Sequence, residues 1–150
     1  MAAVSPVKQL LSTAPFSSLG LDVLAQIEES SELVRYELGA RLLTPKLRSP
    51  GLLVLLQGEV RILSTLSNQR TITLDRRGPG QMMGWVSLLR GESCELIQAS
   101  EPCVCLLIPS DSLVSAWRTS EEFLQFFLER STPSELSYVL LSALSDVNAP

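Results

Sequence analysis

Histidine is absent from the sequence, and this absence excludes more chemistry than any other feature of its composition. Without an imidazole there is no Ser-His or Cys-His nucleophile pair, no zinc deaminase site and no histidine-based metal centre. Lysine occurs only as Lys8 and Lys46, and the acidic residues stand singly apart from two adjacent pairs. We therefore expect no catalytic residues, no metal and no cofactor, and we expect that the chain is not an enzyme.

Cysteine is also scarce, and the three cysteines are too few to complete a four-thiolate zinc site. Cys103 and Cys105 are two residues apart, so both side chains point to one face of a predicted strand, where two small core residues fit. A redox role is the alternative. The odd total, which includes Cys94, and the lack of a signal peptide indicate a reducing, cytoplasmic environment.

Excess positive charge and long apolar runs are missing as well. The formal net charge is -4 and the sequence pI is about 4.9, which disfavours nucleic-acid binding because that needs a basic surface. Apolar runs such as Gly51–Leu56 are far shorter than the roughly 18 residues of a membrane span, so we expect no span in these residues. At 45% hydrophobic and 19% charged, the 150 residues predict a folded globular domain.

The middle of the chain alternates apolar and polar residues with a period of two, and turn residues interrupt it at short intervals. The expected strands are Leu33–Leu38, Ala40–Leu43, Leu52–Gln57, Val60–Thr65, Thr71–Asp75, Glu95–Ser100 and Cys103–Pro109. Many short strands at this spacing predict a mainly β protein, an antiparallel β jelly-roll barrel. A helical turn fits between strands at Val86–Leu89.

Helical patterns flank this barrel on both sides. Apolar residues at three- and four-residue spacing predict one or two short helices between Pro15 and Ile27. We therefore divide the chain into an N-terminal helical lead-in (1–32), a β-barrel core (33–109) and C-terminal helices (110–150).

Three capping patterns set the expected C-terminal helices. Ser110-Asp111 is expected to cap a short helix, Thr119-x-x-Glu122 is a capping box for a helix over 121–130, and Thr132-Pro133 precedes a last helix over 134–144. That last helix has more apolar surface than a small barrel needs. We expect it to contact a second copy of the chain, as a homodimer, or a following domain.

Several segments in order resemble the cyclic-nucleotide-binding domain family, over roughly residues 10–130. The segments are Pro15-Phe16-x-x-Leu19, the hairpin Leu52–Leu63, the run Leu74–Gly84 and the strands within Ile97–Pro109. The resemblance implies a jelly-roll barrel whose phosphate-binding cassette here spans residues 80–99.

The cassette departs from the family pattern at its two charged positions. Trp85 stands where the family has the glutamate that accepts a bond from the ribose hydroxyl, and Ser93 or Cys94 stands where it has the arginine that binds the cyclic phosphate. Each lost charge-assisted bond costs about 1.5 to 3 kcal/mol. Two such losses weaken binding by roughly two to four decades, so we expect weak or no binding of cAMP and cGMP.

The cassette nevertheless contains the candidate ligand-binding residues. These are Gly84, Trp85, Val86, Ser87, Leu88, Ser93 and Cys94. Trp85 either stacks on a ligand ring or fills the pocket that a nucleotide occupies elsewhere. The backbone amides of residues 85–88 are possible anion donors if they begin a helical turn, and the simplest alternative is a surface turn.

A small basic cluster lies just before the cassette, at Arg76-Arg77 with Arg70 nearby. Its simplest interpretation is a solvated strand face paired with acids such as Asp75. A phosphate site or a partner site is the alternative.

The cassette variant Gly-Trp-Val-Ser-Leu-Leu-Arg-Gly is similar to that of N-terminal cyclic-nucleotide-binding-like domains on cyanobacterial ATP-binding-cassette exporters of bacteriocins and toxins. This similarity implies a regulatory or docking module on the cytosolic face of the inner membrane, in a parent protein that is a transport ATPase. Two alternatives stay open. One is a sensor of a cyclic nucleotide or another small ligand with an atypical site, and the other is the sensor domain of a transcription regulator.

Overall fold

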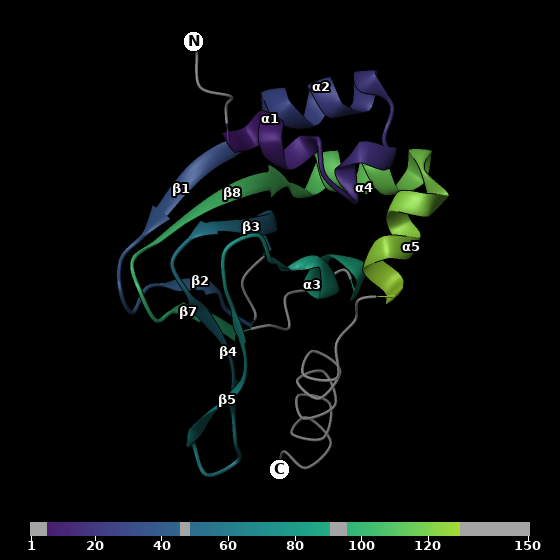
Figure 1. Ribbon diagram of the computed structural model, residues 1–150. Helices are drawn as coiled ribbons and strands as arrows, with labels where there is room; N and C mark the ends of the chain where they lie inside the picture. The colour runs from purple at the N-terminus through teal and green to yellow at the C-terminus, as the bar shows by residue number, and fades with distance from the viewer. Residues whose placement is uncertain (1–5, 46–48, 91–95, 130–150) are drawn as a thin grey trace.

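The chain folds into two antiparallel sheets of four strands each, which pack face to face (Figure 1). This computed structural model describes residues 6–45, 49–90 and 96–129. The first sheet has the order β1 (Glu32–Tyr36), β8 (Cys103–Pro109), β3 (Gly51–Gln57) and β6 (Met82–Met83). The second sheet has the order β2 (Arg41–Leu43), β7 (Leu96–Ala99), β4 (Val60–Thr65) and β5 (Thr71–Arg77). The mainly β, jelly-roll-like fold with flanking helices is confirmed.

All of the expected strands are present; β4 and β8 have the expected bounds, and the ends of the other strands differ by at most two residues. The largest extension is at β5, which continues through Arg77 because it stays paired with β4 as far as Val60. β6 was not expected from the sequence. It is only two residues long, too short for a period of two to be visible, and it exists because it pairs with Leu53 and Val54 of β3.

One hydrophobic core fills the space between the sheets. It takes alternate residues of each strand, such as Leu53 and Leu55 of β3, Ile62 of β4 and Ile97 of β7, all fully buried. Cys105 of β8 belongs to the same core, as the strand periodicity predicts for a small apolar side chain.

A second core lies between the outer face of the first sheet and the helices. Leu52 and Val54 of β3 point into it, while Leu53 and Leu55 point into the inter-sheet core. Because β3 is buried on both faces, its sequence is a continuous apolar run rather than an alternating one.

The helices of the second core come from both ends of the chain (Figure 1). Before the barrel are α1 (Pro6–Leu11), the 3₁₀ turn η1 (Phe16–Ser18) and α2 (Leu21–Ser30), and after it are α4 (Ser110–Thr119) and α5 (Glu121–Glu129). Within the described residues, no helix is long and apolar enough to cross a membrane. The division at residues 32 and 109 stays a prediction.

Two of the expected helix caps are wrong. α4 begins after Pro109 without a side-chain cap, so neither Ser110 nor Asp111 caps it. The N-cap of α5 is Ser120, whose hydroxyl accepts a bond from the Phe123 N–H at 3.1 Å, one residue later than the Thr119 that we expected. Ser120 has the extended backbone that an N-cap requires, whereas Thr119 is still helical. The last expected helix, over 134–144, lies outside the described residues.

Candidate functional site

The predicted cassette contains a tight turn that requires glycine. Gly84 follows β6 directly and has a φ of +97°. A Cβ at this position would lie 2.9 Å from the Gly51 carbonyl oxygen and 3.2 Å from Leu43 Cδ1. Glycine is therefore required both by the left-handed backbone and by the close approach of β3.

A short helix, α3 (Trp85–Arg90), follows this turn. The Gly84 carbonyl accepts a bond from the Leu88 N–H at 3.4 Å, which closes the first turn. The expected helical turn at Val86–Leu89 is thus confirmed, and it is extended by one residue at each end.

Trp85, Val86 and Leu88 of α3 pack into the second core. Trp85, Val86 and Ser87 are 5%, 8% and 1% exposed, and Leu88 is half-buried against the same cluster. Residues 85–87 are therefore not a surface turn. The other two candidate residues, Ser93 and Cys94, lie outside the described residues.

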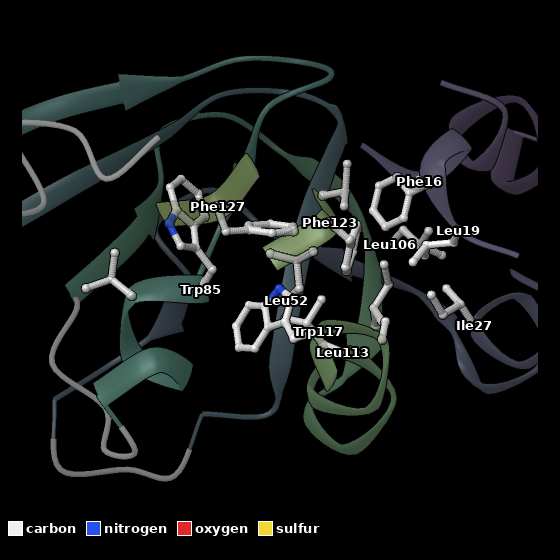
Figure 2. Packing of buried hydrophobic residues seen from close by; sticks show 14 of the residues in the cluster. Phe16, Leu19, Ile27, Leu52, Trp85, Leu106, Leu113, Trp117, Phe123 and Phe127 are labelled. Atoms are coloured by element: carbon white, nitrogen blue, oxygen red, sulfur yellow. The ribbon is translucent and has the colours of Figure 1, made fainter. Parts of the chain in front are cut away.

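Trp85 contacts Phe127 of α5, with the ring centroids 6.0 Å apart and the planes at 59° (Figure 2). Phe127 also contacts Trp117 of α4 at 5.6 Å and Phe123 at 5.1 Å, both edge to face. Phe127 is 1% exposed. One buried aromatic ring on α5 thus contacts both α3 and α4.

Two buried donors near this ring lack hydrogen-bond partners. Trp85 Nε1 and Trp117 Nε1 have no acceptor among the residues that the structure describes. A buried N–H without an acceptor costs about 1 to 3 kcal/mol, so such groups are rare in folded proteins. Sequence reasoning identified Trp85 but not Trp117, since only the packing brings Trp117 to Phe127.

The two thiols of β8, Cys103 and Cys105, are unreactive near neutral pH. Burial, and to a smaller extent the neighbouring Cys103, raises the pKa of Cys105 to about 12. Burial also raises the pKa of Cys103, whose Sγ donates to the Glu59 carbonyl at 3.3 Å. Both thiols stay protonated near neutral pH and are poor nucleophiles. No group of three or more possible metal ligands occurs in ranges 6–45, 49–90 and 96–129.

Comparison with known proteins places this geometry in a family. The sequence model described as "Cyclic nucleotide-binding domain" matches residues 33–120, which include both sheets apart from Glu32, as well as α3 and all of α4. Among curated proteins, no sequence matches significantly.

Solved structures share the fold at low sequence identity. A regulatory subunit of a cAMP-independent protein kinase A from Trypanosoma brucei, as a mutant bound to cAMP in the A site, has a TM-score of 0.76 at 15% identity over 89% of this chain and 49% of that chain. A putative transcriptional regulator of the crp/fnr family from Eubacterium rectale has a TM-score of 0.74 at 18% identity over 89% of this chain and 62% of that chain. The sensor domain of the transcriptional regulator DNR from Pseudomonas aeruginosa has a TM-score of 0.71 at 16% identity over 83% of this chain and 89% of that chain. The chain thus spans about half the length of the kinase regulatory subunit.

Proposed function

The chain belongs to the cyclic nucleotide-binding domain family, and from this premise we propose that it is a regulatory module that passes a change at the cassette to the segment after the barrel. The module itself carries out no reaction. Its finer role, in our proposal, is to be the cytosolic N-terminal domain of an ATP-binding-cassette exporter, with weak or no binding of cAMP and cGMP.

The contact between Trp85 and Phe127 is the observation that carries this proposal. Any ligand or partner that shifts α3 must also move or repack Phe127, because the two rings are buried against each other. Phe127 in turn lies against Trp117 of α4. A ligand biases the helices only to the extent that it prefers one arrangement of this cluster over the other.

Weak nucleotide binding follows from the same burial. By the resemblance, Trp85 stands where the family has a glutamate, and its surroundings are apolar side chains such as Val86 and Phe127. Three of the similar structures are described as regulatory subunits of a cAMP-independent protein kinase A, one of them from Trypanosoma cruzi and bound to guanosine. The fold is thus compatible with regulation by something other than cAMP.

Isothermal titration of the 150-residue chain with cAMP and with cGMP tests the affinity. We expect dissociation constants at least about two decades above the low-micromolar range, the consequence of losing two charge-assisted bonds. Low-micromolar binding of either nucleotide would overturn this part of the proposal.

The gene sequence downstream of the Pro150 codon tests the exporter context. A membrane domain followed by an ATPase domain with a phosphate-binding loop supports it. A helix-turn-helix domain would instead identify a transcription regulator, the role named for two of the similar structures. The homodimer contact through residues 134–144 stays a prediction.

The unpaired indole N–H of Trp85 favours a second function, that of a sensor for a small ligand with a hydrogen-bond acceptor. Such a ligand would supply the acceptor that the described residues do not provide for Trp85 Nε1. A saturable change in tryptophan fluorescence that is lost in Trp85→Phe and kept in Trp117→Phe would support the sensor. An unchanged spectrum with cAMP, cGMP and guanosine would count against these three compounds as its ligands.

A further inference from the structure

Three arginines form a row across the outer face of the second sheet. Gln98 of β7 pairs with Arg41 on one side and with Arg61 of β4 on the other, and Arg61 pairs with Arg76 of β5. Directly paired residues of an antiparallel sheet point to the same face, so the four side chains lie in one line. All three arginines are exposed, whereas the next residue of β4, Ile62, is buried in the inter-sheet core. We call Arg41, Arg61 and Arg76 the arginine row.

The row places two like charges directly opposite each other. Arg61 and Arg76 are register partners on adjacent strands, an arrangement that destabilises a sheet when nothing neutralises it. Violations of such local rules are expected where a surface has a function.

The nearby acids do not neutralise the row. Asp75 forms its ion pair with the buried Arg77 and also accepts a bond from the Arg76 backbone N–H at 2.8 Å. The Oε1 of Glu59 accepts the Ser100 hydroxyl at 2.9 Å. Within the described part of the chain, no carboxylate lies within ion-pair distance of the arginine row.

The rest of the protein has the opposite charge. Acidic residues gather on the helices of the second core, at Asp22, Glu28 and Glu29 of α2 and at Glu121, Glu122 and Glu129 of α5. The whole chain has a net charge of -4. The arginine row is therefore a small basic site on an acidic protein, which repels long polyanions such as nucleic acids and anionic membranes but can accept a short acidic segment.

We propose that the arginine row docks an acidic helix of a partner protein. Neighbouring strands are about 4.8 Å apart, so Arg61 and Arg76 lie about 10 and 14 Å from Arg41 across the sheet. Carboxylates at positions i, i+7 and i+11 of a helix lie on one face, at about 0, 10 and 16 Å along its axis. The flexible arginine side chains cover the remaining difference, and each guanidinium can bind a carboxylate with two parallel bonds. This inference does not depend on whether the chain binds cAMP or cGMP.

A synthetic helical peptide with three glutamates at i, i+7 and i+11 is the probe, labelled for fluorescence anisotropy and titrated with the full chain at low ionic strength. The control peptide has the same composition with its glutamates spread around the helix. We expect the aligned peptide to bind more tightly, and Arg61→Gln to weaken it by about twofold to fivefold, the value of one exposed ion pair. The triple change of Arg41, Arg61 and Arg76 to Gln should remove the difference between the peptides.

Arg118→Gln is the matched control, because Arg118 is an exposed arginine on α4 and the change in charge is the same. Thermal unfolding by circular dichroism checks that each variant is folded. Absence of binding, equal binding of the two peptides, or equal effects of Arg61→Gln and Arg118→Gln would overturn the proposal. Tighter binding of inositol hexakisphosphate, single-stranded DNA or phosphatidylserine vesicles, sensitive to Arg61→Gln, would also overturn it and assign the row to phosphate groups.

Discussion

The contact between Trp85 and Phe127 can be measured by a double-mutant cycle. The two substitutions are Trp85→Leu and Phe127→Leu, which remove the ring contact and leave an apolar side chain in the second core. Each single change should destabilise the protein, since both rings are at least 95% buried.

The size of the effect follows from the geometry. Truncating a buried Trp or Phe to Ala costs about 3 to 5 kcal/mol, so the leucine variants should cost less than this and stay folded. A tilted ring pair at 6.0 Å contributes about 0.5 to 1.5 kcal/mol beyond its buried area. The double variant should therefore be less destabilised than the sum of the singles by about that amount.

Urea unfolding followed by circular dichroism supplies the four free energies of unfolding. The matched control is a second cycle with Trp85→Leu and Phe16→Leu. Phe16 is fully buried in the same core and contacts Phe123 at 5.7 Å, but no ring contact joins it to Trp85 among the described residues. These two changes should be additive within about 0.5 kcal/mol.

A coupling energy for Trp85 and Phe127 no larger than that of the control would refute the reasoning. In that case the cassette helix would not lie against α5 through this pair, and the proposed transmission from cassette to helix would lose its physical basis.

Three further predictions concern the turn, the thiols and the arginine row. Gly84→Ala should lower the free energy of unfolding by about 1 to 3 kcal/mol more than Gly80→Ala in urea titrations, because both residues have a positive φ but only Gly84 has backbone within 3 Å of the added Cβ. Burial raises the pKa of Cys105 from its ordinary value of 9.0 to about 12, so the folded state binds the thiol proton more tightly than the unfolded state does. The contribution of this thiol to the free energy of unfolding is therefore fully present below about pH 9 and is lost as the pH rises toward 12. At about pH 10 the loss is about 1 kcal/mol, and denaturation of Cys105→Ala across this pH range should show a smaller slope. Arg61→Thr should raise the melting temperature in the absence of a partner, since it removes a like-charge pair with Arg76 worth a few tenths of a kcal/mol, whereas Arg61→Lys should not.

The local signals in the sequence predicted most of the strands. Alternation and turn residues are short-range features, and they located β4 within the same residues that the structure has, Val60–Thr65. They failed where partners decide the structure. β6 forms because β3 lies beside it, and the start of α5 moved to Ser120 because that residue takes the extended backbone of an N-cap.

The turn at Gly84 and the helix after it were predicted, whereas the environment of Trp85 was not, and the assignment of these residues to a ligand site stays a prediction. Gly84 and α3 follow from the cassette pattern, yet the sequence left open whether Trp85 stacks on a ligand, fills a pocket or lies on the surface. Its contact with Phe127 joins residues 42 positions apart, and no periodicity reaches over that distance.

By itself the sequence determined the class of fold, the helical turn after Gly84 and the absence of histidine chemistry, because these depend on residue types and on neighbours a few positions apart. The tertiary structure alone decided which side chains meet. The strand order β2-β7-β4-β5 brings Arg41, Arg61 and Arg76 into one row, and the packing of α5 places an aromatic ring against the cassette. Both outcomes depend on pairings between distant segments, whose register is set by burial of the whole core and not by any local stretch.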